Sequence, residues 1–297
     1  MTARPLHIII LNWNGKGVVG ECLKSLGDLN YPDFRITVVD NASTDSSPEM
    51  IRKRFPEVDL IENEQNLLFA GGNNIGLRRG LEGNAELFLL LNNDTEVDPD
   101  FALKMADVFD NPEVGVAGPR IYYYDDPRRI WYGGGGFYPL TGIPRHINIR
   151  KTDTGNKELP CQTGYVTGCA MMVRREVFEK IGLLDISYRM YCEDVDFCLR
   201  AREAGWKCFY VPEARVWHKV SSSSGGGFTP YKFENRIISN AKLLVQHKPL
   251  WWRILAVPLQ SLILVIILIS LIFTGKWDLV RAAAKGLSGI LKIGYFQ

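Results

Sequence analysis

The feature that most constrains this chain is a run of twenty residues without a charged side chain, at positions 254–273. As an α-helix this run would be about 30 Å long, which matches the hydrocarbon core of a bilayer. Trp251 and Trp252 precede it and Trp277 follows it, as is common at membrane interfaces. A buried core helix is the alternative, but few core helices lack charge on every face over this length. We predict a membrane segment, and the sequence leaves open whether it spans the bilayer or returns to the same side.

The segments on either side are assigned from the same pattern. We predict a connecting helix over residues 231–253 and a basic amphipathic tail over residues 274–297. In the tail, apolar residues recur every three or four positions from Trp277, while Arg281, Lys285 and Lys292 lie on another face. That arrangement fits a helix on anionic lipid and fits a solvent-exposed tail helix equally well. Basic residues flank both ends of the apolar run, so they do not decide its orientation.

The composition is that of a protein that packs a core. Of 297 residues, 46% are hydrophobic and 23% charged, which excludes disorder as the main state. The formal net charge is only +2, so no general basic field indicates a nucleic-acid partner. Six cysteines are scattered without a Cys-x-x-Cys pair, and the N-terminus has the pattern of a first strand rather than a signal peptide. We expect reduced thiols and a main domain in the cytoplasm.

Short apolar runs alternate with helical patterns from residue 6 onward. Strands are predicted at residues 6–11, 36–39, 58–61, 87–91, 114–117, 165–174 and 207–211, and helices at 18–26, 73–81, 98–109, 175–181 and 193–204. Another helix should begin near Ser46 and Ser47, and residues 120–160 form a long excursion with room for a hairpin. This order is typical of an α/β fold with a mostly parallel sheet flanked by helices, assigned to residues 1–230.

Polar side chains follow four of these strands. In an open parallel sheet, ligands bind beyond the carboxyl ends of the strands. The residues found there are Asn12 and Asn14, then Asp40 and Asn41, then Gly71, Gly72, Asn73 and Asn74, and finally Asn92, Asn93 and Asp94. Any one group alone would be read as a turn or a cap, but four at one edge favour a phosphorylated ligand such as a nucleotide. Neither a P-loop motif nor a Gly-x-Gly-x-x-Gly motif follows the first strand.

Acidic residues provide the candidate chemistry. Asp94 lies at a strand end, where its carboxylate could hold a divalent cation that bridges diphosphate oxygens. Glu193, Asp194 and Asp196 open a predicted helix, where simple stabilisation by the helix dipole is the alternative. His218 follows a later strand, and metal binding by this histidine is favoured only if the fold brings it next to Asp94.

Six motifs in this order resemble glycosyltransferase family 2, and among its members the bacterial rhamnosyltransferases of cell-surface polysaccharide assembly. They are ILNWN, VVDNASTD, NLLFAGGNNIG, LLLNNDTEV, TGCAMMVRREVFEKIGLLD and YCEDVDFCLRAREAGW. The resemblance covers about residues 5–220. It implies the GT-A fold, a nucleotide-sugar donor, Mn²⁺ or Mg²⁺, and inversion at the anomeric carbon.

The resemblance also implies roles for individual residues. It places a set of residues in the nucleotide and donor-sugar pocket: Asn12, Asn14, Asp40, Asn41, Gly71, Asn73, Asn74, Asn93 and Glu193. Asp40 would hydrogen-bond the base, Asp94 and His218 would bind the metal, and Asp194 would be the catalytic base. Asn92 stands where the family has the first acid of its Asp-x-Asp motif.

The partners implied are a dTDP-, UDP- or GDP-linked sugar, a lipid-linked or glycan acceptor, and membrane lipids, at the inner membrane with the catalytic domain facing the cytoplasm. Residues 221–227, rich in Ser and Gly, form either a lid over the donor or a plain linker. Two other functions stay open. A sugar-phosphate nucleotidyltransferase should carry a Gly-rich phosphate loop after the first strand, and a catalytically inactive binding module would explain Asn92.

Overall fold

An apolar run makes the central strand, β1 (Leu6–Asn12), in which Ile8, Ile9 and Ile10 are fully buried. Strands buried on both faces are typical of parallel sheets covered by helices. The structure is a computed structural model that describes residues 4–220 and 229–291. In it, β2 (Phe34–Asp40) and β4 (Leu87–Asn92) pair with β1 on either side, both in parallel, so that these three strands end at one edge.

The sheet runs in the order β3-β2-β1-β4-β11-β6-β12-β10. Its remaining strands are β3 (Asp59–Glu62), β5 (Thr95–Val97), β6 (Val114–Tyr123), β7 (Asp126–Tyr132), β10 (Cys161–Gln162), β11 (Ala170–Arg174) and β12 (Lys207–His218). β11 is antiparallel to β4 and to β6, and β12 is parallel to β6. The sheet is therefore mixed, but β3, β2, β1, β4, β6 and β12 share one direction and deliver their carboxyl ends to the same side.

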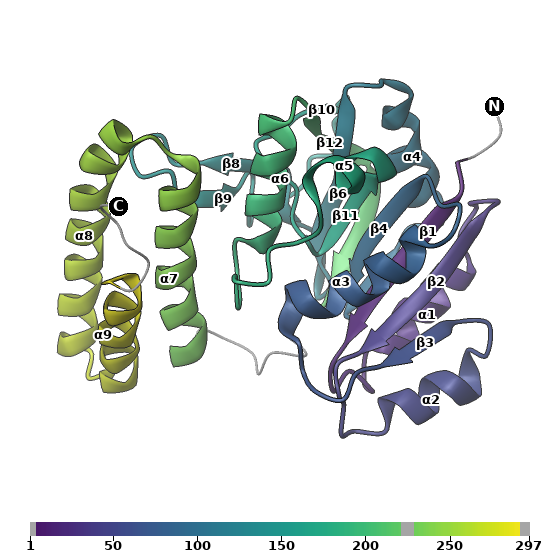
Figure 1. Cartoon of the computed structure of the whole chain (residues 1–297), viewed down its shortest axis with the longest axis horizontal. Helices are drawn as coiled ribbons and strands as arrows, with labels where there is room; N and C mark the ends of the chain where they lie inside the picture. The colour runs from purple at the N-terminus through teal and green to yellow at the C-terminus, as the bar shows by residue number, and fades with distance from the viewer. Residues whose placement is uncertain (1–3, 221–228, 292–297) are drawn as a thin grey trace.

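Helices cover both faces of this sheet, with α3 in front and α1 behind in Figure 1. They are α1 (Val19–Gly27), α2 (Ser47–Arg54), α3 (Leu68–Leu81), α4 (Phe101–Asp107) with the 3-10 turn η1 (Val108–Asp110), α5 (Arg175–Ile181) and α6 (Glu193–Glu203). α3 approaches the sheet closely because glycine faces it. A Cβ atom on Gly76 would lie 2.5 Å from Ile9 Cγ2, and one on Gly72 would lie 2.3 Å from Leu11 Cδ1.

Three helices stand beside the sheet domain, next to α6 and a hairpin (Figure 1). They are α7 (Pro230–His247), α8 (Leu250–Phe273) and α9 (Trp277–Leu291), and the hairpin consists of β8 (Gly135–Phe137) and β9 (Pro144–His146). Phe233 of α7, Leu271 of α8 and Ala282 of α9 share one small apolar core. Gln260, a polar residue inside the apolar run, donates a hydrogen bond of 2.7 Å to the Thr141 carbonyl at the tip of the hairpin.

The α/β fold class is confirmed, and several boundaries differ from the sequence prediction. α3 begins at Leu68, so Asn73 and Asn74 lie inside the helix rather than at its start. β12 continues to His218 because a register shift after Val211 lets the strand bend and resume beside β6. Residues 165–169 precede β11 as a turn instead of extending it, and residues 120–160 contain the end of β6 and the hairpins of β7, β8 and β9.

Candidate active site

Three neighbouring strand ends are joined by hydrogen bonds between buried side chains. The Asn12 amide nitrogen donates to Asp40 Oδ1 at 2.7 Å and to Ser47 Oγ at 2.8 Å. The Asn12 amide oxygen accepts a bond of 2.9 Å from Asn93. A Cβ atom on Gly15 would lie 2.3 Å from that oxygen, so the loop after β1 can cross this network only with glycine there. Asn12, Asp40 and Asn93, three of the predicted nucleotide-site residues, therefore form one polar unit.

The loops after β1 and β2 are tied together above this unit. The backbone N–H of Asn14 donates to Ser43 Oγ at 2.8 Å, and the Asn14 side-chain oxygen accepts the Thr44 backbone N–H at 2.8 Å. Ser43 Oγ in turn donates to Asp40 Oδ1 at 2.6 Å. Asn14 lies in the left-handed region with a φ of 50°, where asparagine is among the most tolerated residues. These contacts fix the shape of the rim on which a nucleotide would lie.

The structure uses the other predicted polar residues in tertiary packing. Asn74 donates to the Leu184 carbonyl at 2.9 Å and accepts from the Leu184 N–H at 3.1 Å, so it fastens α3 to the loop after α5. Asn41 donates to the Leu68 carbonyl at 3.1 Å, and Asn73 donates to a carbonyl one turn earlier in its own helix. Gly71 lies partly exposed in the first turn of α3. Contact of these residues with a nucleotide stays a prediction.

Asp94 and His218, a hundred and twenty-four positions apart, meet at the end of β12. Asp94 Oδ1 lies 3.0 Å from His218 Nε2, and both side chains are buried. The backbone brings them together, because His218 pairs with Thr95 of β5 and the Asp94 carbonyl accepts the Lys219 N–H at 2.9 Å. His218 Nδ1 is buried without a hydrogen-bond partner among the described residues.

This pair fits a hard divalent cation. Two ligands on adjacent octahedral positions, each about 2.1 Å from Mg²⁺, lie about 3.0 Å apart. Within residues 4–220 and 229–291 no group of three or more His, Cys, Asp or Glu residues is placed to hold a metal. The remaining ligands would therefore have to be phosphate oxygens and water, which Mg²⁺ commonly retains.

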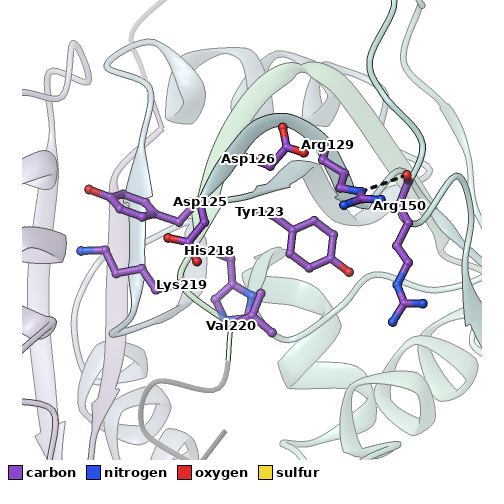
Figure 2. A pocket seen from close by; sticks show the side chains of 9 residues that line it. Tyr123, Asp125, Asp126, Arg129, Arg150, His218, Lys219 and Val220 are labelled. Carbon is purple, nitrogen blue, oxygen red and sulfur yellow. Dashed lines mark hydrogen bonds between the residues drawn. The ribbon is translucent and has the colours of Figure 1, made fainter. Parts of the chain in front are cut away.

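A cavity of about 450 Å³ adjoins His218 (Figure 2). Figure 2 shows Tyr123, Arg129 and Arg150 on one side of the histidine and Lys219 on the other. The Arg129 side chain donates to the Arg150 carbonyl at 3.3 Å. The candidate metal pair therefore borders a space with a partly cationic lining. Residues 221–227, predicted to be a lid or a linker, lie outside the described residues.

One short segment, Gly168–Cys169, connects Asp194 to the end of β4, which precedes Asp94 of the candidate metal pair. Its Oδ2 accepts the Gly168 backbone N–H at 2.8 Å, and its Oδ1 accepts the Val195 N–H at 2.8 Å. The next residue, Cys169, accepts the Asn92 backbone N–H at 2.9 Å. Burial raises the pKa of the Cys169 thiol, and the charges of both Asp94 and Asp194 raise it further. The two carboxylates thus both lie within electrostatic range of the Cys169 thiol.

The pKa values of Glu193 and Asp194 are both raised in the folded protein. Burial, followed by repulsion from Asp194, raises the pKa of Glu193 to about 8, and Glu193 Oε2 has no hydrogen-bond partner among the described residues. Burial also raises the pKa of Asp194, while the hydrogen bonds from Gly168 and Val195 oppose that effect. The hydrogen bonds to Asp194 favour its charged form, so a proton held by the pair is favoured on Glu193.

α7 fixes the turn that presents this pair. Tyr191 and Cys192 both have φ values in the left-handed region, 68° and 66°, which non-glycine residues adopt at a cost. Three residues on one face of α7 contact the turn. Ser239 Oγ donates to the Met190 carbonyl at 2.8 Å, the Arg236 guanidinium lies 5.1 Å from the Tyr191 ring centroid, and Asn240 Oδ1 lies 3.4 Å from Cys192 Sγ. The strained turn is thus held from outside the sheet domain.

A family model described as glycosyl transferase family 2 matches residues 7–182, more than half of the chain. The chain belongs to glycosyl transferase family 2. The match includes the three joined strand ends, Asp94 and the Gly168–Cys169 segment, and it ends before Asp194 and His218. The resemblance stated from the sequence motifs is confirmed.

This family 2 glycosyltransferase has relatives named for rhamnose transfer. It is 28% identical over 270 residues to the N-acetylglucosaminyl-diphospho-decaprenol L-rhamnosyltransferase of Mycobacterium tuberculosis, covering 84% of this chain and 86% of that protein. It is 25% identical to the dTDP-rhamnosyl transferase RfbF of Shigella flexneri, covering 74% of this chain and 70% of that protein. An uncharacterized Sinorhizobium fredii protein is 28% identical, and this chain spans 26% of its length.

Solved structures establish the GT-A fold predicted for the glycosyltransferase. GalNAc-T7 with UDP, GalNAc and Mn²⁺ superposes with a TM-score of 0.63 at 16% identity, covering 82% of this chain and 48% of that one. The mannosyltransferase PcManGT of Pyrobaculum calidifontis, in complex with GDP-Man and Mn²⁺, gives 0.59 at 15% identity, covering 98% and 87%. At these identities the likeness concerns the fold alone.

Sequence reasoning about this glycosyltransferase missed the residues that support the site. Gly168 lies within a motif that carried the resemblance, but the motif gave no reason to join it to Asp194. Ser43 and Ser47 were visible only as turn and helix-start residues. Arg236, Ser239 and Asn240 carried no local signal, because their partners lie about fifty residues earlier in the chain.

The raised pKa of Glu193 predicts a pH-dependent stability difference. In the unfolded chain Glu193 titrates near 4.5, but in the folded protein it titrates near 8, so it favours folding below pH 4.5 and that contribution is lost as pH rises to 8. Glu193→Gln cannot ionise, so its Tm should rise relative to wild type between about pH 5 and pH 8 and level off above. Thermal unfolding across this range measures the effect, with Glu176→Gln on an exposed position of α5 as the control. A Tm difference that is constant with pH would contradict it.

Proposed function

We propose that the chain is an inverting glycosyltransferase that moves a sugar from a nucleotide-diphosphate donor to a hydroxyl of a lipid-linked acceptor in cell-envelope glycan synthesis. The observation that carries this proposal is the link from Asp194 through Gly168–Cys169 to Asn92, two residues before Asp94, at the carboxyl edge of the sheet. That edge is where open α/β sheets bind ligands. Membership of family 2 favours transfer of a sugar over the alternative of nucleotidyl transfer.

Asp194 would act as the general base. Its carboxylate removes the proton of the acceptor hydroxyl while that oxygen forms a bond to the anomeric carbon of the donor. The bond from the anomeric carbon to the diphosphate breaks on the opposite face, and the electron pair leaves with the nucleoside diphosphate. Protonated Glu193 adds no competing negative charge beside the base at neutral pH. A positioned base contributes about 10²–10⁴ in rate.

Asp94 and His218 would hold Mn²⁺ or Mg²⁺, which when bound supplies charge neutralisation for the leaving diphosphate. Their separation of 3.0 Å supports this assignment. Two neighbours of the same fold are named with Mn²⁺ beside a nucleotide or nucleotide sugar. Asn92 supplies an amide in place of a second carboxylate, so the protein contributes less charge to the cation than an Asp-x-Asp motif would.

The names of the relatives support a donor and an acceptor class. dTDP-rhamnose is the donor favoured by the relative named as a dTDP-rhamnosyl transferase. A polyprenyl diphosphate-linked N-acetylglucosamine is the acceptor favoured by the mycobacterial relative. UDP- and GDP-linked sugars are the competing donors, because solved neighbours are named with UDP and GDP-Man.

Replacing the base tests the reaction. Asp194→Asn should lower kcat for transfer by about 10²–10⁴ and leave donor binding intact, because the amide keeps the shape but cannot take a proton. Release of nucleoside diphosphate in the presence of acceptor measures the rate, and calorimetric titration measures donor binding. Normal turnover by this variant would refute the assignment of the base. Slow, metal-dependent donor hydrolysis by the wild type separates an enzyme from an inactive binding module.

Replacing the carboxylate tests the metal. Asp94→Ala should weaken Mn²⁺-dependent binding of a nucleoside diphosphate by at least about tenfold, because one of two protein ligands is lost. Calorimetric titration with and without Mn²⁺ measures this effect. Asp125→Asn is the matched control, since Asp125 lines the cavity beside His218 without contacting it. Equal Mn²⁺ dependence in wild type and Asp94→Ala would exclude the assigned role.

The helices after the sheet domain support attachment to a membrane, which we propose to be the inner membrane with the catalytic domain facing the cytoplasm. Among the described residues α8 is the one helix long and apolar enough to cross a bilayer, and its outward face, including Ile254, Leu255, Leu262 and Ile266, is exposed. Residues 292–297 of the predicted basic tail lie outside the described residues. Most of the tail forms α9, which packs on α7 rather than standing alone in solvent: a Cβ on Gly289 would lie 2.8 Å from Ile238.

We propose that α8 lies in the plane of the membrane interface instead of crossing it. α8 contacts the β8–β9 hairpin through Gln260, near its middle, and Leu271 at its C-terminal end packs in one apolar core with Phe233 at the start of α7. α7 is hydrogen-bonded along its length to the sheet domain and carries Lys232, Glu234, Arg236 and Lys242. A bilayer crossed by α8 would have to take in this charged helix, which is costly.

Cysteine labelling tests the in-plane arrangement. In sealed vesicles with the catalytic domain outside, Thr274→Cys in a Cys161→Ser background should react with a membrane-impermeant thiol reagent, because the exposed turn after α8 stays on the catalytic side. Native Cys161, exposed in β10, controls for the side of the catalytic domain. Labelling of Thr274→Cys only after the vesicles are opened would indicate that α8 crosses the bilayer.

A further inference from the structure

Arg236 is an exposed cation on the face of α7 that clamps the catalytic turn. Its guanidinium lies over the Tyr191 ring, and among the residues that the structure describes no carboxylate lies within ion-pair distance of it. By contrast, Lys242, two turns further along α7, is paired with Asp185 at 3.0 Å. Arg236 therefore presents an uncompensated charge, which is the usual condition of a residue that binds an anionic ligand.

The position of Arg236 places that charge next to the base. Burial raises the pKa of the Tyr165 phenol, the charge of Asp194 adds to this effect, and the charge of Arg236 opposes it. Arg236 and Asp194 therefore act on the same phenol. Burial lowers the pKa of His146 to about 4, and the charges of Arg236 and His218 lower it further. Arg236 and the candidate metal ligand His218 are thus both within electrostatic range of His146.

The residues that follow Arg236 on α7 pack against the helices proposed to contact the membrane. The next two residues, Ile237 and Ile238, pack on Gly286 and Gly289 of α9. α9 in turn shares an apolar core with α8, whose outward face is exposed and apolar. A ligand whose sugar reaches Asp194 and whose hydrocarbon tail lies along α8 would pass Arg236 between the two.

We propose that Arg236 binds the phosphate that joins the acceptor sugar to its lipid, so that it selects acceptors of the class lipid-diphosphate-sugar. The planar guanidinium can bind two phosphate oxygens at once, which an ammonium cannot do in the same geometry. This inference rests on the proposed transfer to a lipid-linked acceptor and adds the group that recognises the linkage. A sugar hydroxyl then faces Asp194 while the anomeric phosphate of the same sugar lies against α7.

Comparison of two acceptors tests the proposal. One is N-acetylglucosamine linked through diphosphate to a short polyprenyl chain, and the other is the octyl glycoside of the same sugar, which has no phosphate. Arg236→Gln should raise KM for the diphosphate acceptor relative to KM for the octyl glycoside by about tenfold to a hundredfold, because any loosening of the turn before Asp194 affects both acceptors equally. Arg236→Lys should give an intermediate KM for the diphosphate acceptor, because the charge remains but the planar group that binds two phosphate oxygens is lost.

Ser239→Ala is the matched control for the clamp. It removes the hydrogen bond to Met190 from the same face of α7 and leaves the charge at Arg236 in place. A merely structural role for Arg236 would make Arg236→Gln behave like Ser239→Ala, with kcat lowered equally for both acceptors, and that result would overturn the proposal.

Vesicle binding distinguishes the source of the phosphate. Wild type and Arg236→Gln should sediment equally with phosphatidylglycerol vesicles; a loss of sedimentation together with an unchanged KM would assign Arg236 to lipid headgroups and reject acceptor recognition. Wild-type protein that hydrolyses the donor but transfers sugar to neither acceptor would refute the proposed function itself. Transfer by wild type with the same ratio of KM values in Arg236→Gln would refute only the role of Arg236.

Discussion

The site depends on two backbone hydrogen bonds that leave adjacent residues in opposite directions. The N–H of Gly168 binds Asp194 at the start of α6, and the carbonyl of Cys169 binds the N–H of Asn92 at the end of β4. These bonds connect the first part of the sheet, which carries the joined polar strand ends and Asp94, to the helix that carries Asp194, the proposed base. A Cβ atom on Gly168 would lie 2.8 Å from the Phe69 ring and 3.4 Å from Asp194 Cβ. Glycine is therefore required where the two parts meet.

The two adjacent acids at the start of α6 are both buried, but their charged forms are not stabilised equally. Asp194 accepts two backbone N–H bonds and stands at the positive end of a helix dipole, both of which favour its ionised form. Glu193 is buried with its Oε2 lacking a hydrogen-bond partner among the described residues, and its pKa is raised to about 8. The environment thus favours the charged form of Asp194 over that of Glu193, because Asp194 receives more hydrogen bonds.

Local signals predicted the sheet and much of the polar rim. The apolar run of β1 and the polar residues after β1, β2 and β4 sufficed to predict which edge carries the ligand residues, since parallel strands end together. Asn74 shows the limit, because an asparagine that caps a distant backbone at Leu184 looks the same in sequence as one that faces a ligand. His218 was singled out by its place after a predicted strand and then by the resemblance, but its position on a strand was missed because β12 bends after Val211 before it resumes. The contacts of α7 depend on tertiary packing and had no sequence signal.

α7 connects the turn before α6 to the helices α8 and α9, which are proposed to contact the membrane. One face of this helix holds Met190, Tyr191 and Cys192 in a strained turn, and neighbouring residues pack on α9. Its last residue, His247, places Nε2 2.8 Å from Oδ1 of Asp196, two residues after Asp194. Burial lowers the pKa of His247, but the hydrogen bonds and charges of Asp196 and Glu203 outweigh that effect and raise it. α7 therefore joins α8 and α9 to the turn before Asp194 through direct contacts. In the proposed function, this one helix would connect attachment to the membrane with the position of Asp194.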